Sequence, residues 1–265
     1  MNTEQLKSKV LDLLVKGGLT AKWRESHKSA ESAEALLEKI RSEKEKRLNG
    51  ELIAKGKKPG AKVEIKEVSD NDKPFEIPES WKWCRLGDIC FEIKRGKSPV
   101  YAEKSDYLVF AQKCNLKQGG ISLSKALYLD EAKLSKYSAD EFMKKGDIVI
   151  NSTGTGTLGR VGFFNLDLPD GILGLVPDGH ITKISPMGKI DTFYIYSYLK
   201  KKQPEIELLG SGSTNQKELK PQSIKDIYIP LPPLEEQKEI SRIAEILLRK
   251  IDSLSEIESL PAGEA

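Results

Sequence analysis

The sequence is poor in the residues from which metal centres and nucleophilic catalytic sites are usually built. It holds two histidines and three cysteines in 265 residues. Cys84, Cys90 and Cys114 lack the paired CxxC spacing of zinc ligands, so we expect no structural zinc site. Three scattered cysteines are instead typical of reduced thiols in the cytoplasm.

Catalytic motifs are also missing. The sequence contains no HExxH pair, no Walker P-loop and no Ser/His/Asp arrangement. An amino-methyltransferase would need an Asp/Asn-Pro-Pro-aromatic tetrapeptide, whereas the one Pro-Pro pair, Pro232-Pro233, has leucine on both sides. We therefore predict that the chain is not an enzyme and that it carries no cofactor or metal of its own.

Long apolar runs and a strong net charge are absent as well. No apolar run is long enough to span a membrane, and the N-terminal residues 1–10 do not resemble a signal peptide, so we predict a cytoplasmic protein without membrane contact. The net charge is +3, and the excess lies in residues 75–230, which hold 22 basic and 19 acidic residues. The remainder holds 21 of each. So small an excess favours a polyanionic partner only if it is focused on one face.

Helical patterns open the chain. Leu6, Val10, Leu13 and Leu14 share one face of a helix predicted over residues 3–16, which Gly17-Gly18 should end. A second helix is predicted from Ala30 to Leu48, ended by Asn49-Gly50. The lysine- and glycine-rich stretch that follows should bury little and is interpreted as a linker. We therefore place segment boundaries at 1–49, 50–74, 75–232, 233–258 and 259–265.

From Phe75 onward the pattern changes to short strands separated by Gly/Pro turns. Residues 77–83 alternate like an edge strand whose two tryptophans anchor a core, and 107–110 and 181–184 predict further strands. A short helix is expected over 130–137, and Asp191 is placed to cap another. Strands with interspersed helices predict a mixed α/β domain, so the whole chain is expected to be α+β.

A glycine-rich turn lies at the centre of that domain, within Asp147–Phe164. Two β-rich runs flank the polar loop 151–157, which predicts a strand-turn-strand unit. The loop also matches GxGxxG, but the dinucleotide motif needs a helix directly after the glycines. Residues 160–171 have β-branched, aromatic, glycine and proline residues there, which argues against a nucleotide cofactor. Contact with DNA and a purely structural turn both remain open.

A second polar, glycine-rich loop at 210–217 and a basic turn at 94–99 add to the first. Two such loops in one weakly basic domain favour contact with a polyanion, although a pair of ordinary surface turns is the alternative. Hydroxyls, amides and cations can donate to phosphates or base edges. The candidate DNA-binding residues are Lys94, Arg95, Lys97, Ser98, Lys113, Asn115, Asn151, Ser152, Thr153, Thr155, Thr157, Arg160, Ser211, Ser213, Thr214, Asn215, Gln216 and Lys217.

The C-terminal segment Glu235–Glu258 predicts a long helix with a coiled-coil-like apolar stripe. Lys250 occupies one position of the seam, and a seam of this period needs a partner helix. That partner is either the N-terminal helices of the same chain or another molecule. The candidate dimerisation residues are Ile240, Ile243, Leu247, Ile251, Leu254 and Ile257.

Four motifs together resemble the specificity (S) subunits of type I restriction–modification enzymes. They are IPESWKW with RLGD at 77–88, GDIVINSTG at 146–154, GSGSTNQ at 210–216, and IPLPPLEEQ at 229–237 leading into the long helix. The proline-to-helix junction is the most specific of these, and the likeness covers roughly residues 75–258. The chain shows one such recognition domain and one spacer helix, so it resembles a half-length form.

The resemblance implies that 75–232 is a target recognition domain for one half of a bipartite DNA site, and 233–258 a spacer and dimerisation helix. It further implies double-stranded DNA, modification (methyltransferase) subunits and a restriction (motor-nuclease) subunit as partners. The apolar seam of the C-terminal helix, together with the single recognition domain, predicts a second copy of the chain as a further partner. S-adenosylmethionine would then lie on the modification subunit, and Mg and ATP on the restriction subunit. A free-standing DNA-binding regulator and a helical interaction adaptor are the alternatives.

Overall fold

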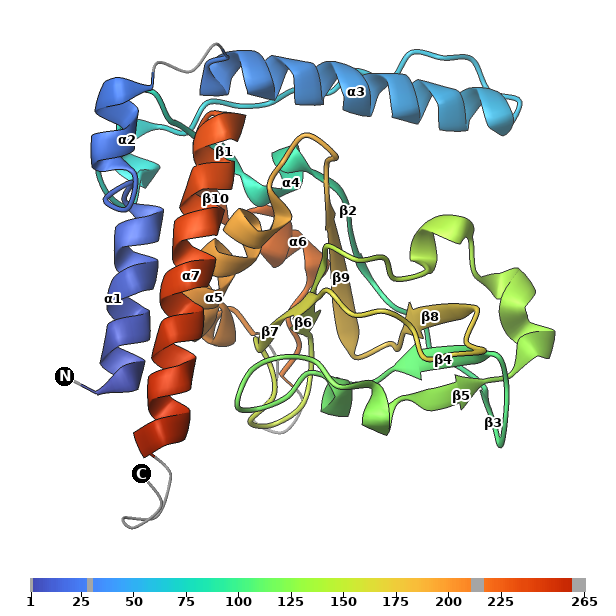
Figure 1. Cartoon of the computed structure of the whole chain (residues 1–265). Helices are drawn as coiled ribbons and strands as arrows, with labels where there is room; N and C mark the ends of the chain where they lie inside the picture. Colours follow the sequence, from blue (N-terminus) through green and yellow to red (C-terminus); the bar gives the residue numbers. More distant parts are fainter. Residues whose placement is uncertain (1, 28–30, 211–216, 259–265) are drawn as a thin grey trace. The chain divides into compact units, whose positions relative to one another are not determined.

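Along the chain, helices precede and follow a set of short strands (Figure 1). The computed structural model describes residues 2–27, 31–210 and 217–258, without the side chains of 255–258. The predicted α+β class, with N-terminal helices and a long C-terminal helix, is confirmed. Within the described residues, no helix has the length and apolar character needed to cross a membrane.

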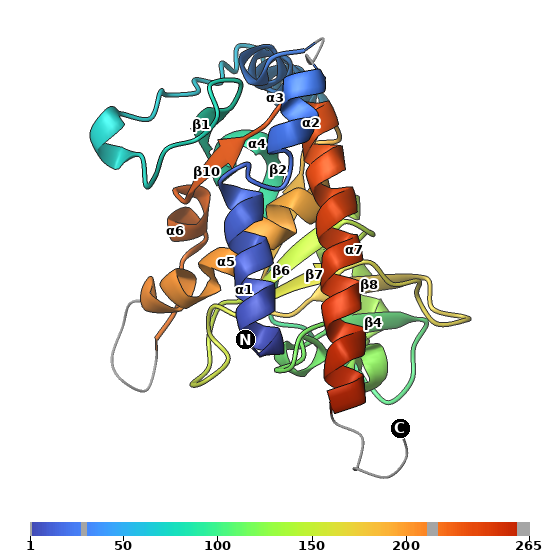
Figure 2. The same cartoon turned by 60° about the vertical axis from the view of Figure 1, so that its left-hand side comes forward.

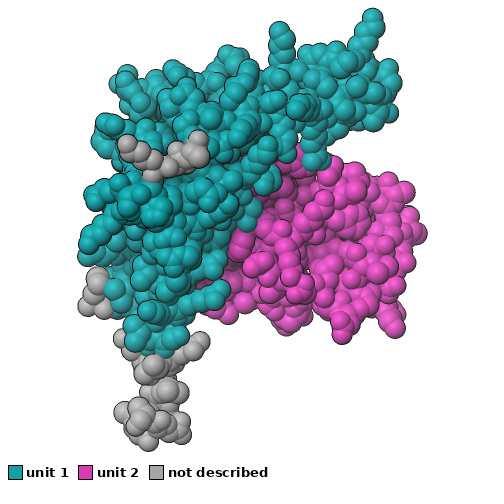
Figure 3. Space-filling view, turned by 45° about the horizontal axis from the view of Figure 1, so that its top comes forward, with its two compact units in different colours: residues 1–84, 188–201, 228–265 teal, residues 85–187, 202–227 magenta. Residues whose placement is uncertain are grey.

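The chain folds into two compact units, coloured separately in Figure 3. Unit 1 contains Met1–Cys84, Gly188–Lys201 and Tyr228–Ala265, and unit 2 contains Arg85–Met187 and Lys202–Ile227. Each unit is therefore assembled from separated stretches, whereas the predicted segments were contiguous.

The first helix of unit 1, α1 (Thr3–Val15), has clear signals at both ends. Asn2 and Gln5 form a capping box, in which each side chain accepts a hydrogen bond from the other residue's backbone amide, at 2.9 and 3.1 Å. Gly17 ends the helix with φ of +73°, a conformation that side chains disfavour. The predicted stop at Gly17-Gly18 is confirmed.

The long helix α7 (Leu234–Glu258) packs against α1, and the two lie side by side in both views (Figures 1 and 2). Lys7, near the start of α1, forms a 2.8 Å ion pair with Asp252, near the end of α7, so the helices run antiparallel. Ile240, Ala244 and Ile251 of α7 are buried. The N-terminal helix therefore covers part of the predicted stripe.

Glu236, at the start of α7, is the centre of a buried hydrogen-bond network in unit 1. Its carboxylate accepts from Thr20 Oγ1 at 2.7 Å, from Arg24 Nε at 2.9 Å and from Trp81 Nε1 at 2.9 Å. The network joins α7 to the helix α2 (Ala21–Ser26) and to the segment before strand β1 (Lys82–Arg85). Trp81 and Trp83 are both buried, which confirms their predicted role as core anchors.

Helix α3 (Ala33–Ala54) continues past the predicted end, so the stop at Asn49-Gly50 was wrong. A glycine inside a helix costs only about 1 kcal/mol, which surrounding contacts can offset. Asn49 supplies such contacts: its Oδ1 accepts from the amides of Gly60 and Ala61 at 2.7 and 2.8 Å. The predicted linker is therefore fastened to the helix at this point. It also contains one short 3₁₀ turn, η1 (Asp70–Asp72).

The predicted edge strand over 77–83 was also too long. Only Lys82–Arg85 forms strand β1, which pairs with β10 (Tyr228–Leu231). Pro78 has no amide to donate to a ladder, and its carbonyl accepts from the Trp81 amide at 2.9 Å in a turn. The segment with alternating apolar and polar residues therefore forms a turn at Pro78–Trp81, followed by the short strand β1.

Unit 2 contains two four-stranded sheets. The first has the order β2-β9-β6-β7 and is antiparallel throughout, while the second has the order β3-β5-β4-β8 and pairs β4 with β8 in parallel. The first sheet comprises β2 (Cys90–Arg95), β6 (Asp147–Asn151), β7 (Val161–Phe164) and β9 (Ile181–Pro186). The second comprises β3 (Tyr101–Ala102), β4 (Tyr107–Phe110), β5 (Leu127–Leu129) and β8 (Gly174–Pro177).

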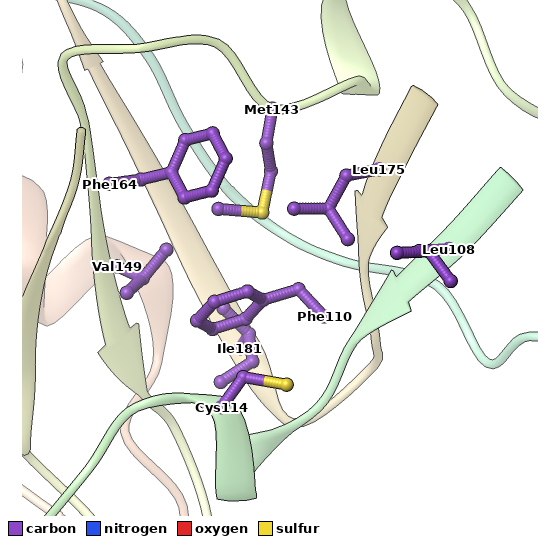
Figure 4. Close-up of a cluster of buried hydrophobic side chains, with 8 residues drawn as sticks. All are labelled: Leu108, Phe110, Cys114, Met143, Val149, Phe164, Leu175 and Ile181. Carbon is purple, nitrogen blue, oxygen red and sulfur yellow. The ribbon is translucent and has the colours of Figure 1, made fainter. Parts of the chain in front are cut away.

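A core of apolar side chains joins the two sheets (Figure 4). Phe110 and Leu175 come from the second sheet, and Val149, Phe164 and Ile181 from the first. Every residue of β6 is buried, so this strand holds one end of the glycine-rich turn on a fixed base.

Further helical elements, short except for α5, complete the described chain. Asp191 Oδ1 accepts from the Tyr194 amide at 2.8 Å, which confirms its predicted role at the start of a helix. The helix predicted over 130–137 is a 3₁₀ helix. These elements are α4 (Leu86–Ile89), η2 (Gln112–Cys114), η3 (Leu123–Lys125), η4 (Glu131–Lys136), η5 (Ala139–Glu141), α5 (Thr192–Leu208) and α6 (Pro221–Lys225).

Candidate nucleic-acid interface

The glycine-rich turn joins β6 to β7, which pair in register from Asp147↔Phe164 to Ile150↔Val161. The predicted strand-turn-strand unit is therefore confirmed. The chain leaves the turn as strand β7, so the helix that a dinucleotide-binding motif requires at this position is replaced by a strand.

The three glycines of the turn all have positive φ, but their surroundings differ. A Cβ on Gly159 would lie 2.6 to 2.9 Å from Glu207, so this glycine is required for close packing against α5 within unit 2. A Cβ on Gly156 would meet no atom within 4 Å. The turn is therefore anchored at its end, while Gly156 and its exposed neighbour Thr155 form an accessible tip.

Buried amides hold the turn against the segment that follows β4. Asn115 Nδ2 donates to Asn151 Oδ1 and to the carbonyl of Arg160, both at 3.0 Å. Arg160 Nη1 donates in return to the Asn115 carbonyl at 2.8 Å. Asn115 and Asn151 are buried, so their side chains fix the shape of the loop and present little surface to a ligand.

A third segment reaches the turn through His180. The Ser152 amide donates to the His180 carbonyl at 2.7 Å, and His180 Nδ1 lies 2.8 Å from Thr153 Oγ1. On the other side, Gln112 Nε2 donates to the carbonyl and hydroxyl of Thr153 at 2.7 and 2.9 Å. Thr153 is therefore held from both sides.

The segment after the second glycine-rich loop meets the same turn. The Leu219 amide donates to the Ser152 carbonyl at 2.8 Å, and Thr153 and Glu218 form a β-bridge. We call the segments 112–122, 152–160, 178–180 and 217–219 the loop cluster. Five candidates lie outside the described residues: Ser211, Ser213, Thr214, Asn215 and Gln216.

The basic turn, which begins in the last two residues of β2, is paired with carboxylates of unit 2. Lys94 Nζ and Lys97 Nζ lie 2.9 and 2.6 Å from the two carboxylate oxygens of Glu141, while Arg95 pairs with Glu218. Burial would raise the pKa of Glu141, but hydrogen bonds from Lys97, Lys94 and the Ser138 amide lower it, and the resulting pKa is about 2. Glu141 therefore remains a carboxylate that neutralises part of this turn.

The candidates thus separate by accessibility. Asn115, Asn151 and Ser152 are buried, whereas the cations Lys113 and Lys217 of the loop cluster are exposed. The exposed candidates are Lys94, Ser98, Lys113, Thr155 and Lys217, and the half-buried ones are Arg95, Lys97, Thr153, Thr157 and Arg160.

Four residues of this region were not predicted: Gln112, Glu141, His180 and Glu218. Gln112 stands in a polar run directly after a strand, which is a usable signal. The other three reach their partners across long sequence separations, such as 123 residues between Arg95 and Glu218, so no local pattern indicates them.

The described chain thus combines an α+β domain, in which polar loops converge, with helices toward both of its ends. Residues 78–260 match the family described as "Type I restriction modification DNA specificity domain", and the chain belongs to this family. The resemblance seen in the sequence is confirmed.

Individual relatives support the same assignment. The chain is 32% identical over 191 residues to the type I restriction enzyme MjaVIII specificity subunit of Methanocaldococcus jannaschii, over 69% of this chain and 42% of that protein. Its fold resembles the crystal structure of the HsdS subunit from Thermoanaerobacter tengcongensis, with a TM-score of 0.52, 20% identity and coverage of 86% and 51%.

A second fold likeness, with a TM-score of 0.55 and 21% identity, covers 86% of this chain and 52% of the other. That chain comes from a structure titled as the basis of complex assembly and conformational transition of the type I R-M system. This chain therefore spans about half the length of the proteins it matches.

Proposed function

We propose that the chain reads one half of a bipartite double-stranded DNA target as the specificity component of a type I restriction–modification system. The loop cluster carries this proposal. Four segments of unit 2 converge there, and within them Lys113, Thr155 and Lys217 are exposed and the tip at Gly156 is open. Lysine side chains can bind DNA phosphates. A threonine hydroxyl on a small, exposed loop tip can enter a groove and form hydrogen bonds to base edges.

The buried residues have a different role in this proposal. Asn115, Asn151 and Arg160 fix the loop shape, so base-reading groups are presented in one geometry. Replacing Asn115 would therefore affect recognition through the loop, while Thr155 would act directly at the DNA.

The chemistry of the system is assigned to partners. We propose that modification subunits bind S-adenosylmethionine and methylate adenine, and that a restriction subunit uses Mg and ATP, all in the cytoplasm. The chain itself neither methylates nor cleaves. Isothermal titration of the chain with S-adenosylmethionine should give no heat of binding, and a measurable affinity would contradict this assignment.

We also propose that two copies pair through α7. Ile240, Ala244 and Ile251 are buried, while Ile243 and Leu247 are half-buried and Leu254 is 50% exposed. This partly open edge is where a second α7 would pack. The remaining dimerisation candidate, Ile257, has a side chain outside the described set.

The test is co-purification of the chain with the modification subunit encoded beside it, followed by binding to a pool of random duplexes. We expect a sequence-specific complex that methylates DNA. A free-standing regulator would instead select DNA tightly without the modification subunit, and a helical adaptor would show no salt-dependent affinity.

T155A should weaken the preference for one base at one position of the DNA target, with a loss of roughly 1–3 kcal/mol in discrimination against the other bases. K113Q should weaken binding to all DNA sequences by the same factor. If neither variant changes binding or the methylated motif, the loop cluster is the wrong surface.

A further inference from the structure

The strongest concentration of positive charge in the chain lies outside the loop cluster, in residues 44–66. This stretch, which we call the basic arm, holds eight basic and three acidic residues. Its net charge of +5 exceeds the net charge of +3 of the whole chain. The residues outside 75–230 have no net charge as a whole. The positive charge of the basic arm is offset in that sum by residues 231–265, which hold four basic and eight acidic residues.

The arm consists of the second half of α3 and the chain that returns beside it (Figure 1). Gly56, with φ of +69°, turns the chain, and the Lys57 amide donates to the Leu52 carbonyl at 2.8 Å. Asn49 then holds Gly60 and Ala61, as described above. The Val63 amide donates to Glu45 at 2.9 Å. The lysines of the returning chain are therefore attached to a defined element.

Most of the arm's charge is unpaired. Of its three acids, Glu45 accepts from the Val63 amide, Glu51 lies 3.5 Å from Arg47, and Glu64 is exposed. Within the described ranges, the exposed lysines of the arm without a carboxylate at ion-pair distance are Lys46, Lys55, Lys57, Lys58, Lys62 and Lys66. The basic turn differs, since Glu141 neutralises two of its lysines.

The arm lacks an apolar face. The buried residues of α3 are Ala33, Leu36 and Ile40, all before residue 44. Leu48 and Ile53 are exposed singly. The helical part of the arm therefore lacks the continuous buried apolar stripe that a membrane surface or a coiled-coil partner needs.

We propose that the basic arm binds the phosphate backbone of duplex DNA without reading bases. Flexible lysines act as point charges and tolerate the phosphate spacing of any sequence, and each neutralised phosphate releases counterions. The helical part, residues 44–54, extends about 15 Å, enough to follow several phosphates of one strand. The inference rests on the proposed function, because it assumes that DNA is the chain's polyanionic ligand.

The test compares two triple variants in complex with the modification subunits. K55Q/K57Q/K58Q removes three charges from the arm. K9Q/K22Q/K238Q removes three exposed charges elsewhere in unit 1 and serves as the matched control. All six side chains are exposed, so we expect folding to be unchanged, and thermal unfolding checks this. Fluorescence anisotropy then measures affinity for specific and random duplexes from low to moderate salt.

We expect the arm variant to lower the salt slope by about two to three and to weaken both duplexes equally, roughly tenfold or more. The control should match wild type. Equal slopes for the arm variant and the control would overturn the inference. So would weakened assembly with the modification subunit at an unchanged slope, which would identify an acidic protein surface as the partner. Failure of wild type to bind DNA would instead contradict the proposed function.

Discussion

At the scale of single residues, Glu141 controls how much positive charge the basic turn presents. Glu141 is 7% exposed and its carboxylate binds both Lys94 and Lys97, so the two cations are paired within unit 2. E141Q should release both lysines and raise affinity for random duplexes several-fold, with a salt slope steeper by up to about two.

The control for this change is E131Q on the exposed side of η4, which leaves both lysines paired. An unchanged salt slope in E141Q would show that Lys94 and Lys97 stay away from phosphate even when released. Anisotropy at several salt concentrations separates these outcomes.

Glu141 should also make folding stability depend on pH. Its folded pKa of about 2 lies below the ordinary value of 4.5, so its contribution is complete above pH 4.5 and is lost as pH falls toward 2. The shift corresponds to about 3 kcal/mol at most. Urea unfolding of wild type and E141Q should therefore converge between pH 4.5 and 2. Parallel curves over that range would contradict the assigned role.

The candidate residues show where local sequence patterns stop being informative. The strand-turn-strand unit was predictable, because alternating apolar residues and glycines act locally. The burial of Asn115 and Asn151 and the pairing of Lys94 were not, because their partners lie tens of residues away. A polar side chain in a loop therefore indicates a site only once its long-range partners are known.

At the scale of elements, Glu236 ties the start of α7 to the N-terminal helices. It is 1% exposed and bonds to Thr20, Arg24 and Trp81. E236A leaves a partly buried guanidinium and a buried indole N–H without their acceptor, so we expect a loss of about 3–5 kcal/mol in the free energy of unfolding.

Chemical denaturation measures that loss, and limited proteolysis should show faster cleavage before residue 27. E235A, at the neighbouring exposed position, is the control and should change stability little. If E236A unfolds like E235A, the network is not what fixes the N-terminal helices.

The α7 stripe gives a second prediction at this scale. L247D/L254D places charges on the partly open edge, and we expect it to abolish the dimer while unit 2 stays folded. I246D, at an exposed apolar position of the same helix, should leave the dimer intact. Sedimentation at tens of micromolar measures both, and a monomeric wild-type chain would contradict the pairing.

Helix boundaries were predictable where capping residues decide them, and less so where tertiary contacts do. The α1 helix begins at a capping box and ends at a glycine, both visible in the sequence. The α3 helix continues through Asn49-Gly50 because the Asn49 side chain forms hydrogen bonds with the backbone of residues 60 and 61. The local sequence pattern does not predict this contact.

At the scale of the whole molecule, the chain spans about half the length of the relatives it matches. It contains one recognition domain and one long helix. Two antiparallel copies joined by α7 would supply two recognition domains related by two-fold symmetry. Such a pair should read the same half-site twice, in opposite orientations, with a fixed gap between them.

Mapping methylated adenines in DNA from cells that express only this chain and its modification subunit tests that account most directly. We predict a single split motif whose halves are inverted repeats, and whose sequence changes when Thr155 or Lys113 is replaced. Methylation without any shared motif, or a split motif with two unrelated halves in the absence of another specificity chain, would contradict the account.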